Sequence, residues 1–165
     1  MSIAYWCILT AAILPYFSTM LAKAGANYDN YAPRVQLEQL EGYRKRAYWS
    51  QLNAFEAFPA FAAAVIIAQL QHVTPTTVDI LALNFIVLRI LHAIFYVFNK
   101  AMLRSLVWML GFAQVIALFV LAGNAWSTCL RDQGLLSVLC DMEPDMVADK
   151  GWNKIIAMVV VGVSA

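Results

Sequence analysis

The sequence predicts an all-α membrane protein whose transmembrane helices form a four-helix bundle. Hydrophobic residues make up 62% of the 165-residue chain and charged residues only 13%, whereas a soluble domain usually carries about 25% charged residues. Four apolar stretches are long enough to span a bilayer, which takes roughly 20 residues in a helix. Eleven Lys and Arg against ten Asp and Glu give a net charge of +1, so no basic field attracts nucleic acid.

The four predicted spans cover most of the first 126 residues. They run over Ile3–Ala22, Ala47–Leu70, Val78–Phe98 and Ser105–Trp126. The first has no charged segment ahead of it and no clear cleavage site, so we expect it to be retained rather than removed as a signal peptide. The short connectors 71–77 and 99–104 require neighbouring helices to pack antiparallel. Thr76 followed by Asp79 is typical of a helix start.

The distribution of cations predicts the orientation of the chain in the membrane. The loop 23–46 contains five Lys and Arg residues, and the 99–104 turn contains Lys100 and Arg104. The 71–77 connector and the residues before the first span contain none. Because cytoplasmic loops carry the excess of Lys and Arg, we expect both basic loops in the cytoplasm and both termini on the other side.

We predict that the residues after the fourth span, 127–165, form a separate tail, whose fold the sequence does not determine. Its apolar segment Ile155–Val163 is too short to span a bilayer unaided, and it could dock on the bundle, lie in the interface or belong to a fifth helix. Cys129 and Cys140 would lie on the non-cytoplasmic side, where either a disulfide or two unpaired thiols is reasonable. Cys7, inside the first span, is predicted to be a buried small apolar residue.

Polar side chains gather within the second and third spans. The second span carries Asn53 and Glu56, and the third carries Arg89, His92 and Tyr96. Ionisable groups inside a bilayer are unfavourable by roughly 2.5 kcal/mol or more, and each therefore indicates a site. The 1.5 Å rise per residue places Glu56 and Arg89 at matching depths of roughly 14 Å, which predicts an ion pair. The helical period puts the polar residues of each span on one face, and the two faces should meet.

This cluster has a structural and a functional interpretation. Polar contacts of this kind can simply hold two transmembrane helices together. The cluster also leads to Lys100, Arg104 and Ser105 at the membrane surface, which favours a cation-rimmed cavity for an anionic or amphipathic ligand. Arg104 is either an interfacial anchor or a charge that stabilises a thiolate or carboxylate at a helix start. His72 and His92 lie at opposite depths, so we expect no metal site.

The polar residues resemble the MAPEG family, the membrane-associated proteins in eicosanoid and glutathione metabolism. The resemblance lies in the ordered set Asn53-x-x-Glu56, Arg89-x-x-His92-x-x-x-Tyr96 and Arg104-Ser105. It covers about residues 1–126, which we predict to form the membrane domain. The bacterial branch is the most similar, through the pairs Pro33-Arg34, Arg46-Ala47 and Leu103-Arg104.

The resemblance implies a homotrimer in a bacterial inner membrane, with glutathione between subunits at the cytoplasmic side. The residues that it assigns to glutathione binding are Asn53, Glu56, Arg89, His92 and Tyr96, with Arg89 in the polar core beneath the tripeptide. Arg104 would stabilise the glutathione thiolate, and Ser105 would donate a hydrogen bond to it. The chain departs from the family at Gln51, where a histidine is usual, and at Trp108, where the prostaglandin synthase branch has a tyrosine.

The expected function is that of a glutathione transferase or peroxidase acting on lipophilic electrophiles or lipid hydroperoxides. The alternative is a non-catalytic accessory or scaffold subunit of a larger membrane complex, which the additional tail favours. A small transporter is a third class, but short-looped helices without broken segments give little sign of alternating access.

Overall fold

The structure, a computed structural model, describes residues 2–24 and 31–133. Within them the chain forms five helices: α1 (Ile3–Lys23), α2 (Pro33–Glu38), α3 (Gly42–Leu70), α4 (Pro75–Val97) and α5 (Ala101–Gln133). Four are long and apolar enough to cross a membrane, over Ile3–Lys23, Gly42–Leu70, Pro75–Val97 and Ala101–Ser127. The predicted all-helical fold class with four spans is confirmed.

Several helices extend beyond the predicted spans. α3 begins at Gly42 rather than Ala47, and α5 continues to Gln133. Hydropathy detects only the part of a helix that matches the apolar core of a bilayer, whereas the backbone hydrogen bonds continue through polar turns. The six-residue helix α2 was not predicted because it is too short to show a helical period of apolar residues. The apolar segment Ile155–Val163 and the side chains of Cys129 and Cys140 lie outside the described residues.

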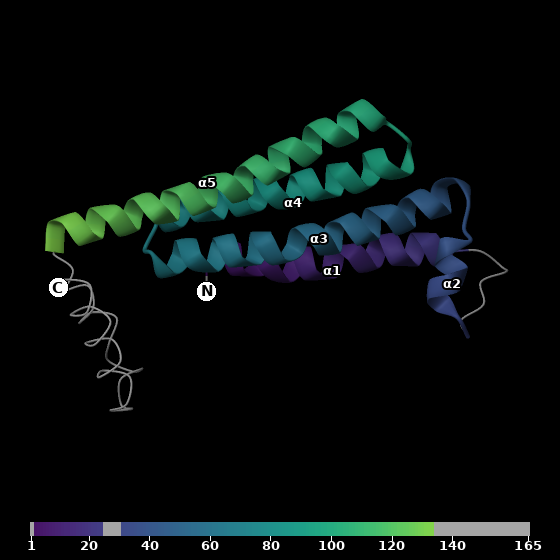
Figure 1. Cartoon of the computed structure of the whole chain (residues 1–165), viewed down its shortest axis with the longest axis horizontal. Coiled ribbons are helices and arrows are strands. Elements are labelled where there is room, and N and C mark those ends of the chain that lie inside the picture. The colour runs from purple at the N-terminus through teal and green to yellow at the C-terminus, as the bar shows by residue number, and fades with distance from the viewer. Residues whose placement is uncertain (1, 25–30, 134–165) are drawn as a thin grey trace, which may run out of the picture. The chain divides into compact units, whose positions relative to one another are not determined.

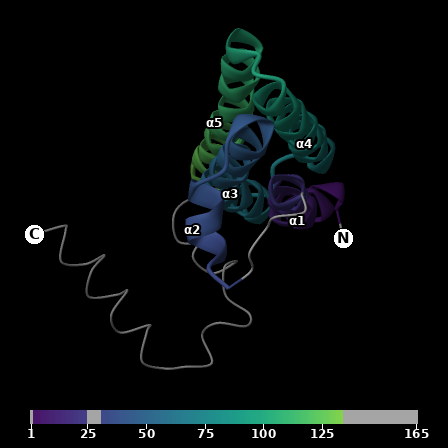
Figure 2. The ribbon, with the colours of Figure 1, turned by 90° about the vertical axis from the view of Figure 1, so that its right-hand side faces the viewer.

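Backbone packing divides the chain into two units, Met1–Ala125 and Trp126–Ala165. Within the first unit, α1 and α3 lie side by side (Figures 1 and 2). Their contact includes small buried residues, Ala4, Cys7 and Ala11 on α1 with Ala64 and Ala68 on α3. Small side chains let transmembrane helices approach closely. The interpretation of Cys7 as a buried apolar residue is confirmed.

Larger side chains join α4 and α5 to the same core. The ring of Phe61 on α3 stacks on that of Phe85 on α4, with 3.9 Å between centroids. Val115 and Leu118 of α5 are buried in the same cluster. Figure 1 shows α5 running back along α4 after a short turn, as the short connectors predicted.

Asp79 connects the start of α1 to α4. Its Oδ1 accepts a hydrogen bond of 2.8 Å from the backbone N–H of Ala4, one of the donors that a helix N-terminus leaves unpaired. Next to it, Gln69 Nε2 donates to Ser2 Oγ at 2.8 Å. Thr76 and Asp79 lie in the first turns of α4, so the helix start that the sequence indicated is present. Among the described residues, however, α4 has no side-chain cap, and Asp79 caps α1 instead.

Three consecutive cations join helices at the other end of the bundle, which we call the basic end. Arg44 Nε donates to the carbonyl of Ala22 at the end of α1, at 2.9 Å. Lys45 Nζ donates to the carbonyl of Glu38 at the end of α2. Arg46 Nε donates to Val97 O at the end of α4, at 2.9 Å. Cations are favourable where a helix leaves carbonyls unpaired, so the first turn of α3 stabilises three helix C-termini at once.

Candidate functional site

The candidate site begins on α4, where polar residues succeed one another on a single face. Arg89 and His92 are 5% and 4% exposed, so both are held inside the bundle. The His92 and Tyr96 rings contact edge to face, with centroids 5.4 Å apart. The spacing of three and four residues places the three side chains on successive turns. The face therefore runs from the buried Arg89 toward the basic end.

Asn53 on α3 connects the two polar faces. Arg89 Nη1 donates to Asn53 Oδ1 at 3.1 Å. Asn53 Nδ2 lies 3.5 Å from Glu56 Oε2, to which it donates. The two polar faces therefore meet, as the helical period predicted.

The predicted ion pair between Glu56 and Arg89 is wrong for the residues that the structure describes. The hydrogen bond from Arg89 reaches Asn53, and Asn53 in turn donates to Glu56. Matching depths fix the height of a residue on a helix but not the direction of its side chain. Asn53 and Glu56 point about 60° apart on a helix of 3.6 residues per turn. Glu56 is exposed while Asn53 is half-buried.

An aromatic ring and a glycine also lie close to Arg89. Its guanidinium carbon lies 5.6 Å from the centre of the Phe85 ring. On α5, a Cβ added to Gly111 would lie 3.5 Å from Arg89 Nη2. Gly111 therefore leaves the space that the guanidinium fills between α4 and α5. Among the described residues, no group forms a hydrogen bond with the buried Arg89 Nε.

Arg104 and Ser105 stand in the first turn of α5. The Arg104 N–H donates to the Lys100 carbonyl at 2.9 Å, so the turn is already helical there. The guanidinium carbon of Arg104 lies 4.5 Å from the centre of the Tyr96 ring, within the range of a cation–π interaction. This contact holds Arg104 against α4, while Ser105 beside it is exposed.

These residues line a cavity of about 400 Å³ near the basic end, which we call the outer cavity. Five of the predicted site residues form its wall: Asn53, His92, Tyr96, Arg104 and Ser105. Trp108 and Met109 of α5 complete it. Its size is within the roughly 300–1,000 Å³ of small-molecule pockets, and its wall combines a cation with several hydrogen-bonding groups.

A second cavity, of about 150 Å³, is lined by the other two predicted residues, Glu56 and Arg89. We call it the inner cavity. It shares Asn53 and Trp108 with the outer cavity. The structure thus brings all seven predicted residues into the walls of two cavities with common wall residues.

Sequence reasoning noted Trp108 only as a departure from the prostaglandin synthase branch, and it missed Phe112 and Val115 of α5. Trp108 and Phe112 are exposed and stacked on each other, with ring centroids 5.6 Å apart. Both line the inner cavity, as does Val115. They follow Arg104 at intervals of three or four residues, so the helical period could have found them.

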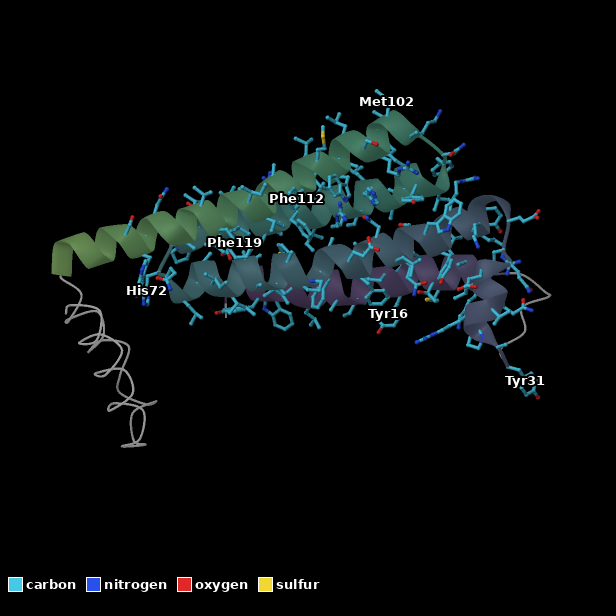
Figure 3. All side chains as sticks on the ribbon, in the orientation of Figure 1. Tyr16, Tyr31, His72, Met102, Phe112 and Phe119 are labelled. Atoms are coloured by element: carbon cyan, nitrogen blue, oxygen red, sulfur yellow. The ribbon has the colours of Figure 1, made fainter. Side chains whose placement is uncertain are left out.

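No group of three or more His, Cys, Asp or Glu side chains within residues 2–24 and 31–133 could hold a metal ion. His72 lies at the α3–α4 turn, at the opposite end of the bundle from Met102 in the first turn of α5 (Figure 3). His92 lies in the wall of the outer cavity instead. The two histidines are therefore far apart along the bundle.

A sequence model of the MAPEG family matches residues 3–124. The chain belongs to the MAPEG family. The match contains all four candidate spans up to residue 124 and every residue that lines the two cavities. MAPEG membership makes this an integral membrane protein related to glutathione metabolism. No curated protein and no solved structure gives a significant match to the chain.

Proposed function

We propose that this MAPEG protein binds glutathione in the outer cavity and uses its thiolate as a transferase or peroxidase on lipophilic substrates. One observation carries the proposal. Arg104 is held over the Tyr96 ring and stands next to Ser105 in the wall of a cavity of about 400 Å³. A fixed cation beside a hydroxyl at a helix start favours the charged form of a bound thiol.

The chemistry of the cavity wall suits a peptide that carries carboxylates, an amine and a thiol. Arg104 can interact with an anionic group, and the side chains of Asn53, Tyr96 and Ser105 can donate or accept hydrogen bonds. Glu56 lies outside this wall, in the inner cavity, but its exposed carboxylate accepts a hydrogen bond from Asn53 of the outer cavity and is available to an ammonium group. Because none of the described residues that line the two cavities is a Cys, the nucleophilic thiol would come from the substrate.

In the transferase reaction the thiolate sulfur forms a bond to an electrophilic carbon, and a leaving group such as chloride departs with the bonding electron pair. In the peroxidase reaction the thiolate attacks the outer oxygen of a hydroperoxide. The O–O bond breaks, and the lipid alkoxide takes a proton to become an alcohol. The resulting sulfenic acid then reacts with a second glutathione to give the disulfide and water. In both reactions Arg104 would stabilise the thiolate that attacks.

The proposed assembly is a homotrimer. Several polar residues within the candidate spans, among them Asn84, are exposed on the single chain. Polar groups facing lipid are unfavourable, and contact with another copy would cover them. We further propose that the basic end faces the cytoplasm of a bacterium, because Lys and Arg collect on that side of the inner membrane. Residues 1–126 would then form the membrane domain and 127–165 a non-cytoplasmic tail.

A glutathione titration of the purified full-length protein in detergent tests the proposal. We expect saturable thermal stabilisation together with the ultraviolet absorbance of a thiolate at neutral pH. Turnover of 1-chloro-2,4-dinitrobenzene and of a lipid hydroperoxide then separates transferase from peroxidase activity. A folded protein that neither binds glutathione nor shows the thiolate would contradict the proposal and favour the accessory-subunit alternative.

A further inference from the structure

The guanidinium of Arg89 presents its donors to two different helices. Its Nη1 donates to Asn53 Oδ1 on α3 at 3.1 Å. The edge formed by Nε and Nη2 faces α5, because a Cβ added to Gly111 would lie 3.5 Å from Nη2 and 3.7 Å from Nε. Both nitrogens carry N–H donors, so acceptors for this edge have to come from the side of α5.

The edge of Arg89 that faces α5 lacks an acceptor where water does not reach it. Arg89 is 5% exposed, and among the described residues no group forms a hydrogen bond with its buried Nε. A buried donor without a partner is unfavourable, and more so when it belongs to a charged group. The arrangement therefore favours any nearby side-chain oxygen that can turn toward Nε.

Gln114 of α5 carries such an oxygen. Within residues 106–123, all of them described, it is the one residue whose side chain contains an oxygen atom. It follows Gly111 by three residues, which places it one turn further along α5 and about 60° from the direction of Gly111. Its Oε1 is itself buried, and no described residue donates a hydrogen bond to it. An unpaired acceptor therefore lies one turn from an unpaired donor.

The guanidinium of Arg89 also extends toward the turn of α5 that carries Gln114. Its carbon lies 5.6 Å from the centre of the Phe85 ring, one turn nearer the start of α4 than Arg89 itself. Since α5 runs back along α4 (Figure 1), the direction toward the start of α4 is the direction toward the end of α5. Gln114 lies in the next turn beyond Gly111 in that direction.

We infer that Gln114 is a positioning residue for the glutathione site: rotation of its side chain brings Oε1 onto the Nε–H of Arg89, and α3 and α5 then hold the guanidinium together. The inference rests on the proposed function. A guanidinium fixed in this way keeps its bond to Asn53 Oδ1, which leaves Asn53 Nδ2 on the side of Glu56. Because Asn53 lines both cavities, its Nδ2 is then oriented to donate to a bound peptide. Gln114 lines neither cavity and acts through the other two side chains.

Hydrogen exchange of the Arg89 Nε–H tests the contact directly and without a ligand. The signal is recorded by nitrogen-15 NMR of the full-length protein in lipid nanodiscs and is assigned by its absence in Arg89→Lys. In Gln114→Leu we expect this proton to exchange roughly fivefold faster than in the wild type, as for the loss of one hydrogen bond. Gln114→Glu keeps an oxygen acceptor and should retain the slow exchange.

Glutathione binding to the same samples measures the consequence for the site. In Gln114→Leu the dissociation constant for glutathione should rise about fivefold, the value of one hydrogen bond, because Asn53 is no longer oriented. The thiolate absorbance at saturation should stay unchanged, because the variant leaves Arg104 in place. In Gln114→Glu we expect the affinity of the wild type.

The matched control is Gln69→Leu. It removes the same amide from α3, where Gln69 donates to Ser2 Oγ at the start of α1, and it should change neither the exchange of the Arg89 proton nor the affinity for glutathione. If Gln114→Leu fails to fold, Gln114→Met removes the same oxygen with a flexible side chain of similar length.

Two results would overturn the inference. One is equal exchange of the Arg89 Nε–H in the wild type and in a folded Gln114 variant that lacks the oxygen. The other is an unchanged dissociation constant in a variant whose exchange is faster. A wild-type protein that binds no glutathione contradicts the proposed function instead, and the exchange rates then still establish or overturn the contact between Gln114 and Arg89.

Discussion

The guanidinium carbon of Arg104 lies 4.5 Å from the centre of the Tyr96 ring, so the first turn of α5 is fixed against the last turns of α4. Tyr96 in turn contacts His92 edge to face. This series of contacts positions the cation at the wall of the outer cavity before any ligand arrives. Preorganised charge of this kind stabilises a developing or existing anion better than a mobile one.

Replacing Arg104 should therefore remove the thiolate. In Arg104→Ala we expect the thiolate absorbance at neutral pH to be lost and kcat/KM to fall about 100-fold or more, as when one oxyanion donor is removed. The matched control is Lys100→Ala, which removes a nearby exposed cation outside both cavity walls. Equal loss in the two variants would mean that general positive charge, and not the position of Arg104, supports the thiolate.

The contact between Asn53 and Arg89 should contribute more to the stability of the polar core than the contact between Glu56 and Arg89. A double-mutant cycle with Asn53→Ala and Arg89→Met, measured by thermal unfolding in detergent, should give a coupling of about 1.5–3 kcal/mol, as for hydrogen bonds to charged groups. The same cycle with Glu56→Ala should give a smaller coupling, because Asn53 separates Glu56 from the guanidinium. A larger coupling energy for Glu56 than for Asn53 would support the direct ion pair that the sequence suggested.

Asp79 should stabilise α1 although it lies on α4. Asp79→Ala removes the acceptor of the Ala4 N–H and should destabilise the bundle by about 0.5–2 kcal/mol, as for loss of a helix N-cap. Asp79→Asn keeps an acceptor oxygen and should lose less. Hydrogen exchange of the first turn of α1 reports the effect locally. Similar stabilities for Asp79→Ala and the wild type would show that the cap contributes nothing.

Much of the fold could be predicted because apolar length and helical period are local properties. The four helices and the common face of Arg89, His92 and Tyr96 follow from them. The choice between Asn53 and Glu56 as the partner of Arg89 depends on where each side chain points in the assembled bundle. The inner cavity depends on packing of α5, and α2 is too short to give a periodic signal. Asp79 illustrates the same limit, since a local motif cannot identify a partner on another helix.

The cations in the first turn of α3 should stabilise the bundle as well as determine its orientation in the membrane. Arg46→Ala removes the donor to Val97 O at the end of α4 and should destabilise the bundle by about 0.3–1 kcal/mol, the usual value of a cation at a helix C-terminus. Arg34→Ala is the matched control, since Arg34 is exposed on the short helix α2.

The space around Gly111 should accommodate the side chain of alanine but not that of a larger residue. A Cβ at this position would lie 3.5 Å from Arg89 Nη2, an ordinary contact, and alanine favours a helix over glycine by about 1 kcal/mol. Gly111→Ala should therefore preserve or raise the melting temperature. Gly111→Leu would occupy the space of the guanidinium and should separate Arg89 from Asn53, which lowers stability by about 1–3 kcal/mol through overpacking. Because the displaced charge would also lose its acceptor, the Leu variant should lose the Asn53–Arg89 coupling energy. A stable Gly111→Leu protein that retains this coupling would show that α5 does not confine Arg89.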